Sequence, residues 1–342
     1  MPNHDAASED SAAILRMAFA FVTSQTLYVA ADLGIADYLA AGPLTAPELA
    51  ATLGLHPDAL ARLAQALAAF GILRLEAGRF GLTATGQLLR SDSPRSLRAT
   101  VRFLAGPWAW RAFEQLSHSV RSGESSFEHV WGVSNFDYWR QNPEVSAIHD
   151  EAMTGLTATE IARVLEAYDF TPFHSIVDVG GGNGALLAAI LRRQPTARGI
   201  LMDLPHVVEL APTVLRDAGV EARCEVVPGS FFESVPSGAD LYLLKHIIHD
   251  WDDDRSFTIL TNCNRSMGND SRLLIIDRVL SDQPNVAEPM GYLVDMTMLA
   301  MTPGGRERTE GEFRALLASA GLRFERSINV GGICDIVEAR RS

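Results

Sequence analysis

Five short apolar runs, each followed by a segment with helical periodicity, constrain the fold of this chain most strongly. The runs cover residues 175–179, 199–202, 224–227, 241–244 and 273–276. Strands that alternate with helices predict a parallel sheet covered on both faces. Two later runs, 323–328 and 333–339, are joined by a short turn and predict a closing hairpin. The sequence thus predicts an α/β fold with a doubly wound, Rossmann-like sheet of seven strands, the last of them antiparallel.

In the first half of the chain, apolar residues recur at helical intervals, which predicts a mostly helical domain. Thr45 and Glu48 have the spacing of a capping box, and Pro57 suits the first turn of a second short helix. Residues 72–75 and 79–82 flank a Glu-Ala-Gly turn and predict a small hairpin. Two short helices followed by a hairpin indicate a winged helix.

A winged helix often binds DNA, but the charge balance argues against that here. The chain has 42 acidic and 29 basic residues, a net charge of -13, which repels nucleic acid and anionic membranes. Residues 1–95 hold six arginines against nine acids, and the would-be reading helix carries only Arg62. We therefore expect this module to pack and dimerise rather than to bind DNA.

The cysteines and the N-terminus indicate a cytoplasmic protein. Cys224, Cys263 and Cys334 are odd in number and lack ligand-like spacing, so neither a disulfide framework nor a zinc site is expected. The first residues are polar and acidic, unlike a secretory leader. No uncharged apolar run reaches the ~18 residues of a membrane span.

The strongest local motif is a glycine-rich turn between the first strand of the sheet and the next helix. Gly180, Gly182 and Ala185 satisfy the dinucleotide-binding pattern, and Asp203 after the next strand could hold a ribose hydroxyl. Asp178 places a negative charge beside the turn, which is unfavourable next to pyrophosphate and favourable next to a cation. S-adenosylmethionine, with a sulfonium and an ammonium, suits this turn better than NAD does, although the glycines alone do not decide.

A second group of polar residues follows the fourth strand. Lys245, the only lysine of the chain, precedes His246 and His249, which lie three residues apart. Asp277 follows the next strand, and Glu307 lies between two arginines after a pair of glycines. A histidine flanked by carboxylates suits a general base. Each acid taken singly is equally well explained as the partner of a neighbouring arginine.

These motifs, in this order, resemble the class I S-adenosylmethionine-dependent O-methyltransferases. More narrowly, the chain is similar to the caffeic acid and hydroxyindole O-methyltransferase family, whose bacterial members act on phenazines and aromatic polyketides. The resemblance implies methyl transfer from S-adenosyl-L-methionine to a phenolic hydroxyl of an aromatic secondary metabolite by a homodimer, without a metal. It also implies a dimerisation domain over residues 1–105, a helical linker contributing to the substrate pocket over 106–169, and a cofactor-binding catalytic domain over 170–342.

The resemblance assigns roles to individual residues. It makes His249 the base, with Asp277 and Glu307 as flanking acids. Its cofactor-binding positions are Thr157, Asp178, Gly180, Gly182, Asp203, Leu204, Ser230, Phe231 and Lys245. Its substrate-facing positions are Met153, Asp250, Met298 and Thr302.

Two positions depart from the family pattern. Ser230 stands where the family often has an aspartate that binds adenine, and Asp277 is one methylene shorter than the usual glutamate. Four methionines precede the Gly304-Gly305 turn and suit a flat aromatic ring, although at helical spacing methionines are more often plain core. Three alternatives remain at this stage: an NAD-dependent oxidoreductase, a winged-helix DNA-binding or scaffold protein, and a relative that has lost methyl transfer.

Overall fold

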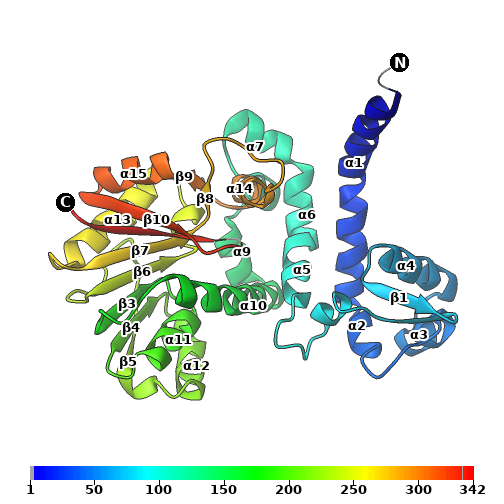
Figure 1. Cartoon of the computed structure of the whole chain (residues 1–342), viewed down its shortest axis with the longest axis horizontal. Helices are drawn as coiled ribbons and strands as arrows, with labels where there is room; N and C mark the ends of the chain where they lie inside the picture. Colours follow the sequence, from blue (N-terminus) through cyan, green and yellow to red (C-terminus); the bar gives the residue numbers. More distant parts are fainter. Residues whose placement is uncertain (1–3, 333) are drawn as a thin grey trace. The chain divides into compact units, whose positions relative to one another are not determined.

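The computed structural model describes residues 4–332 and 334–342, which divide into two packed units (Figure 1). One unit comprises the chain up to Trp110 together with Asn142–Leu156. The other comprises Arg111–Gln141 and Thr157–Ser342. The divisions fall within α6 (Pro107–Glu114) and α10 (Pro143–Ala167), so both units contain parts of these two helices.

The N-terminal unit contains the predicted winged helix. Thr45 accepts a hydrogen bond from the backbone of Glu48, whose side chain accepts one from the backbone of Thr45, so the capping box is formed. The apolar sides of α3 and α4 and the strand residues Leu73, Phe80 and Leu82 bury one another in a shared core. The elements are α1 (His4–Asp32), α2 (Ile35–Tyr38), α3 (Ala46–Leu53), α4 (Pro57–Ala69), β1 (Leu73–Glu76), β2 (Arg79–Leu82), η1 (Gly86–Leu89) and α5 (Arg98–Ala105).

Helix α1 leaves large apolar side chains uncovered. Ile14, Leu15, Met17, Phe19 and Phe21 are each more than half exposed. By length and composition the segment Glu9–Asp32 would also pass as a membrane-crossing helix, with Arg16 inside it. That criterion is weak, because the buried core helix of a soluble protein and a signal sequence meet it too. The exposed side chains nevertheless make α1 a large apolar surface of this unit.

The second unit is built on the predicted seven-stranded sheet, in the order β10-β11-β7-β6-β3-β4-β5. Strand β11 runs antiparallel to both neighbours, whereas the other pairings are parallel. The predicted antiparallel end is therefore confirmed, although Ile333, where we expected the last strand to begin, lies outside the described residues. The strands are β3 (Ser175–Val179), β4 (Arg198–Asp203), β5 (Cys224–Pro228), β6 (Leu241–Lys245), β7 (Arg272–Asp277), β10 (Leu322–Asn329) and β11 (Asp335–Arg341).

Helices cover both faces of this sheet. Together with short 3-10 turns, they make up most of the rest of this unit. They are α7 (Leu116–Ser122), α8 (Ser126–Trp131), α9 (Asn135–Gln141), α11 (Ala185–Arg193), η2 (Val208–Leu210), α12 (Ala211–Asp217), η3 (Glu221–Arg223), η4 (Ile248–Asp250), α13 (Asp253–Ser266), α14 (Met290–Met301) and α15 (Glu310–Ser319).

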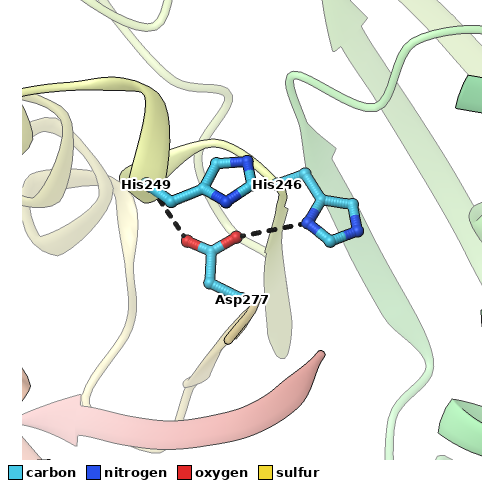
Figure 2. A group of neighbouring side chains, drawn as sticks. All are labelled: His246, His249 and Asp277. Atoms are coloured by element: carbon cyan, nitrogen blue, oxygen red, sulfur yellow. Dashed lines mark hydrogen bonds and ion pairs between the residues drawn. The ribbon is translucent and has the colours of Figure 1, made fainter. Parts of the chain in front are cut away.

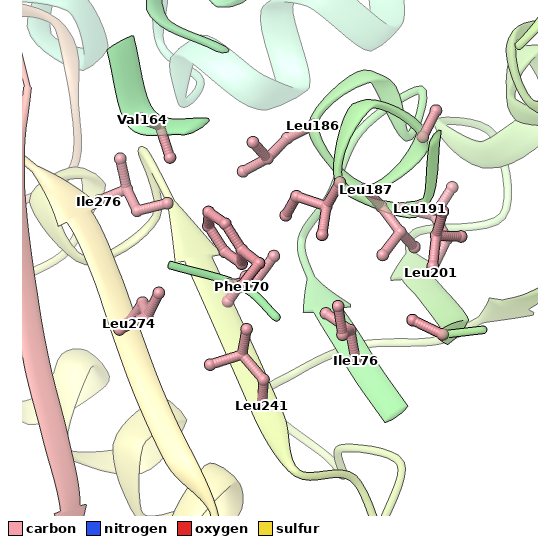
Figure 3. Packing of buried hydrophobic residues seen from close by; sticks show 14 of the residues in the cluster. Val164, Phe170, Ile176, Leu186, Leu187, Leu191, Leu201, Leu241, Leu274 and Ile276 are labelled. Carbon is pink, nitrogen blue, oxygen red and sulfur yellow. The ribbon is translucent and has the colours of Figure 1, made fainter. Parts of the chain in front are cut away.

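The central strands β3, β6 and β7 are largely apolar because both of their faces are buried. Ile176 and Leu241 point into the core under α11 and α12, as Figure 3 shows. Val177 and Tyr242, the next residues along each strand, pack into the core that includes α13 and α15. Continuous apolar runs are typical of parallel strands covered on both faces. Polar residues are consequently concentrated where the strands end.

One feature of this unit was not foreseen from the sequence. Strands β8 (Val279–Leu280) and β9 (Arg308–Thr309) form a short parallel pair beyond the end of β7. Two-residue strands carry too little periodicity to be predicted. This pair fixes the segment that contains Glu307 next to the chain leaving β7.

Candidate active site

The glycine-rich turn joins the end of β3 to the start of α11. Gly180 has a φ of +71°, which L side chains rarely adopt, and a Cβ there would lie 2.5 Å from Cδ1 of Ile247, so a larger residue would be strained. Gly182 has a φ of +61° and open space beside it, where a Cβ would meet nothing within 4 Å. The first glycine thus permits close packing, and the second leaves room for a ligand against the backbone.

Asp203, at the end of β4, is tied to this turn. Its carboxylate accepts hydrogen bonds from the backbone N–H groups of Gly182 at 2.8 Å and Leu204 at 2.7 Å. Burial raises its pKa, and the two backbone N–H groups only partly offset that effect. Gly182 and Asp203, which are 21 residues apart in the sequence, therefore meet at the carboxyl ends of β3 and β4.

Asp178 lies buried in β3, with 1% of its surface exposed. Neither of its carboxylate oxygens has a hydrogen-bond partner within the described chain. Burial raises the pKa of Asp178 to about 7, and the positive charge of Lys245 counteracts this only in part. A buried carboxyl group without partners is costly, and a cationic ligand nearby would stabilise its ionised form.

Lys245 ends β6 and points toward α10. Its Nζ donates to Oγ1 of Thr157 at 3.0 Å and lies 2.8 Å from Oε2 of Glu160. Burial alone would raise the pKa of Glu160, but His246 and Lys245 outweigh it and lower that pKa to about 2. Glu160 was not predicted from the sequence. Its spacing of three residues from Thr157, which places both on one side of a helix, was the available signal.

His249 lies in the 3-10 turn η4, directly beyond β6, and its imidazole contacts Glu307. Nδ1 of His249 is 2.8 Å from Oε1 of Glu307, and Glu307 is 2% exposed. Asp277 approaches differently: its Oδ2 accepts a hydrogen bond from the backbone N–H of His249 at 3.2 Å (Figure 2). Glu307 is thus the acid that orients the imidazole, whereas Asp277 holds the main chain of the turn.

The charges around the two histidines shift their pKa values in opposite directions. Burial would lower the pKa of His249, but the carboxylates of Glu307 and Asp277 outweigh burial and raise that pKa to about 10. Burial and the adjacent Lys245 charge lower the pKa of His246 in spite of Glu160. The pKa of His249 therefore lies well above the ordinary histidine value.

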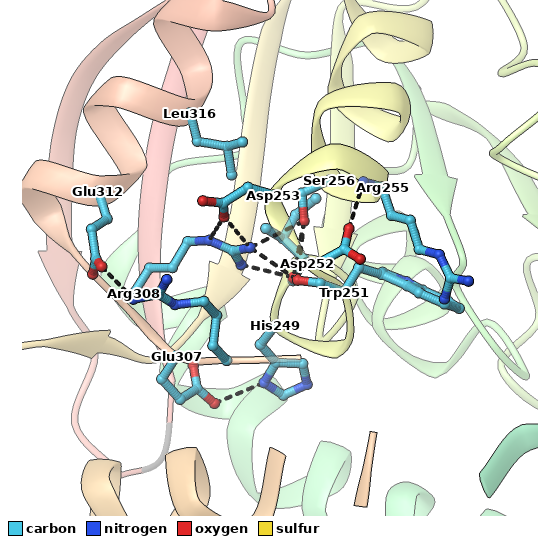
Figure 4. A network of polar contacts seen from close by, with 12 residues as sticks. His249, Trp251, Asp252, Asp253, Arg255, Ser256, Glu307, Arg308, Glu312 and Leu316 are labelled. Carbon is cyan, nitrogen blue, oxygen red and sulfur yellow. Dashed lines mark hydrogen bonds and ion pairs between the residues drawn. The ribbon is translucent and has the colours of Figure 1, made fainter. Parts of the chain in front are cut away.

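Arg308 connects the segment after Glu307 to the turn that carries His249 (Figure 4). Its guanidinium donates at 2.9 Å to the carbonyl oxygens of both Ile248 and Trp251, one on each side of His249. It also pairs with Asp253 at 2.8 Å and is 1% exposed. Because Glu307 and Arg308 are consecutive, this clamp fixes the imidazole and its carboxylate relative to each other.

The predicted substrate-facing positions lie in three different segments of the chain. Asp250 lies beside His249, with its Oδ1 3.8 Å from Nε2 of that imidazole. Met298 and Thr302 are at the end of α14, where Oγ1 of Thr302 donates to the Met298 carbonyl oxygen at 2.8 Å. Met153 belongs to the part of α10 in the N-terminal unit.

Two further predicted positions lie after β5. Ser230 accepts a hydrogen bond from the backbone of Phe232 at 3.3 Å. The ring of Phe231 packs at an angle against the ring of Trp251, with centroids 6.4 Å apart. Trp251 also stacks on Phe136, with centroids 5.4 Å apart. These contacts place the segment after β5 next to the turn after β6.

Comparison with known proteins matches both parts of the chain. Residues 113–323 match the model of the O-methyltransferase domain, and residues 15–92 match that of the O-methyltransferase dimerisation domain. A phenazine O-methyltransferase of Lysobacter antibioticus is 42% identical over 332 residues, covering 96% of each chain. The mitomycin biosynthesis 6-O-methyltransferase of Streptomyces lavendulae is 42% identical over 323 residues, covering 93% of this chain and 91% of that one.

Solved structures agree. The neocarzinostatin-biosynthesis O-methyltransferase NcsB1, in complex with S-adenosylmethionine and 2-hydroxy-5-methyl naphthoic acid, matches with a TM-score of 0.80 and 33% identity over 94% of this chain and 96% of that one. The fold and the site define an S-adenosylmethionine-dependent methyltransferase. The chain belongs to the O-methyltransferase family that pairs this catalytic domain with an N-terminal dimerisation domain.

Proposed function

We propose that the protein methylates a phenolic hydroxyl of an aromatic small molecule, with His249 as the general base. The observation that carries this proposal is the buried contact between Nδ1 of His249 and Oε1 of Glu307 at 2.8 Å. That contact leaves Nε2 as the ring nitrogen available to an acceptor hydroxyl. Asp250 and Trp251, which follow His249, flank the same turn.

Proton transfer is favourable in this arrangement because the two groups are matched. A free phenol has a pKa of about 10, and the pKa of His249 is also raised to about 10. A phenol beside a neutral imidazole and a phenolate beside an imidazolium hold the same single proton. At neutral pH an imidazole with this pKa is itself protonated, so the pair must first release one proton to solvent. The remaining proton then moves between the phenolic oxygen and Nε2 at little cost, because the two pKa values match.

Several residues fit S-adenosylmethionine, which supplies an electrophilic methyl group on a sulfonium. The open backbone at Gly182 and the carboxylate of Asp203 suit the nucleoside end, whereas the unpartnered Asp178 suits a positive charge. The positions we assign to the cofactor are Thr157, Asp178, Gly180, Gly182, Asp203, Leu204, Ser230, Phe231 and Lys245.

The acceptor's ring requires an apolar, adaptable surface. Met298 is half-buried at the end of α14, next to the buried Thr302. We assign these two residues, with Met153 and Asp250, to the substrate, because thioether side chains adapt to flat rings. A phenazine or an aromatic polyketide is the class of acceptor that such a surface suits.

We also propose that the enzyme works as a cytoplasmic homodimer that binds neither nucleic acid nor membranes. The exposed apolar residues of α1 and the match to a dimerisation domain both favour burial of this helix face against a second copy of the chain. A net charge of -13 opposes polyanionic partners.

The test is incubation of the purified protein with S-adenosylmethionine and a panel of phenazines, naphthoic acids and other hydroxylated aromatics. We expect a mass gain of one methyl group on a ring hydroxyl. A parallel calorimetric titration with S-adenosylhomocysteine and with NAD separates the alternatives. Binding of NAD in place of S-adenosylhomocysteine would contradict the proposal, and so would methylation only of acceptors without an aromatic hydroxyl.

A further inference from the structure

His246, His249 and Asp277 form a compact cluster of groups that can bind a metal ion (Figure 2). Each contributes one nitrogen or oxygen atom, and these atoms lie within 4.8 Å of one another. The residues come from the end of β6, the turn η4 and the end of β7. The parallel pairing of β6 with β7 is what brings them together.

The side chain of His246 presents a lone pair to this cluster. Its Nε2 lies 3.0 Å and 3.1 Å from the two carboxylate oxygens of Glu160. A carboxylate accepts hydrogen bonds, so in the neutral imidazole the proton is on Nε2 and Nδ1 is an acceptor. A carboxylate on the far nitrogen is also the usual support for a metal-binding histidine.

This lone pair faces another acceptor. Nδ1 of His246 lies 3.8 Å from Oδ1 of Asp277. Both atoms are buried, and neither has a hydrogen-bond partner within the described chain. Asp277 is 1% exposed, so water does not compensate it from outside. Two buried acceptors that face each other are unfavourable until a positive centre lies between them.

We propose that His246, His249 and Asp277 bind a divalent transition metal ion, with Zn²⁺ as the ion that fits best. Two imidazole nitrogens and a carboxylate oxygen are a common zinc ligand set. Glu307 lies 2.8 Å from Nδ1 of His249 and is a contact of this histidine outside the three-residue set. Bound metal occupies a ring nitrogen of His249, so it inhibits methyl transfer rather than assisting it. This inhibition rests on the proposed role of His249, whereas the binding does not.

Zinc binding is tested by calorimetry on the full chain in a non-chelating buffer. We expect one Zn²⁺ per chain, and a loss of affinity of at least about tenfold in His246→Asn. Asparagine suits this position because the backbone of His246 has a φ of +54°, which asparagine tolerates better than most residues. The absorption bands of bound Co²⁺ supply a second readout that does not depend on turnover.

The matched control is His118→Ala. His118 stacks on His129 with ring centroids 3.9 Å apart, which makes this pair the rival histidine site. We expect His118→Ala to bind Zn²⁺ like the wild type. Unchanged affinity in His246→Asn would overturn the proposal and would leave an imidazolium as the positive centre between the two acceptors. Zinc binding without inhibition of an active enzyme would retain the site and contradict the role of His249.

Discussion

Nδ1 of His249 lies 2.8 Å from Oε1 of Glu307, although 58 residues of sequence separate them. Both side chains are almost completely withdrawn from water. A buried, charge-assisted contact of this kind holds the ring in one orientation and stabilises its protonated form.

Replacement of His249 by Ala or Gln is expected to reduce turnover at least about a hundredfold, because the phenol loses its proton acceptor. Cofactor affinity, measured by calorimetry, should change little. His246→Asn is the control and should have a mild effect. A larger loss in the control than in the His249 variants would exchange the roles of the two histidines.

Glu307→Gln is expected to lower turnover about tenfold or more, because the amide no longer stabilises the imidazolium. Asp277→Asn should have a smaller effect, since an amide oxygen can still accept the backbone hydrogen bond of His249. The pH dependence of kcat separates the two variants: loss of the Glu307 charge should move the apparent pKa of the base downward. Equal effects of both variants would contradict the assignment of Glu307 as the orienting acid.

Affinity for S-adenosylmethionine should rise with pH as Asp178 ionises. The pKa of this carboxyl is raised from 3.8 to about 7. The protonated Asp178 therefore contributes fully to the stability of the folded protein below pH 3.8, its pKa in the unfolded chain, and this contribution is lost as pH rises through about 7. The carboxylate that forms above that pH favours a bound cation. We expect binding about tenfold weaker at about pH 6 than at the alkaline plateau. Asp178→Asn should bind without this pH dependence, and an unchanged slope in that variant would exclude Asp178.

Arg308→Met is expected to lower the free energy of unfolding by about 3 kcal/mol, because two carbonyl oxygens lose the buried guanidinium that donates to them. Those oxygens belong to Ile248 and Trp251. Urea denaturation followed by circular dichroism measures the change. Arg306→Met removes a half-exposed arginine two positions away and should cost much less. Similar losses in both variants would mean that Arg308 is not a clamp.

Phe19→Asp is expected to convert a dimer to a monomer, because it places a charge on the uncovered face of α1. Light scattering over a concentration series gives the mass. Val120→Asp is the matched control, since Val120 on α7 is 69% exposed and Phe19 is 62% exposed. A Phe19→Asp protein that keeps the mass of the wild type would place the interface elsewhere.

The sequence alone determined the order of the strands along the chain, the capping box at Thr45 and the glycine-rich turn after β3. These are local features: propensity, periodicity and chain reversal depend on residues a few positions apart. For the same reason the resemblance to a methyltransferase family could be stated on three short motifs. The resemblance also implied that a carboxylate flanks His249, but it did not indicate whether Asp277 or Glu307 contacts the ring.

Tertiary structure decided which groups meet. Glu307 rather than Asp277 contacts the imidazole because the β8–β9 pair and Arg308 place it there. Glu160, which was not predicted as a site residue, contacts Lys245 and His246 from α10. Charge and burial at such positions depend on elements remote along the chain. The pKa values of His249 and Asp178 therefore arise from the packed site, since burial and neighbouring charges set them and residue type does not.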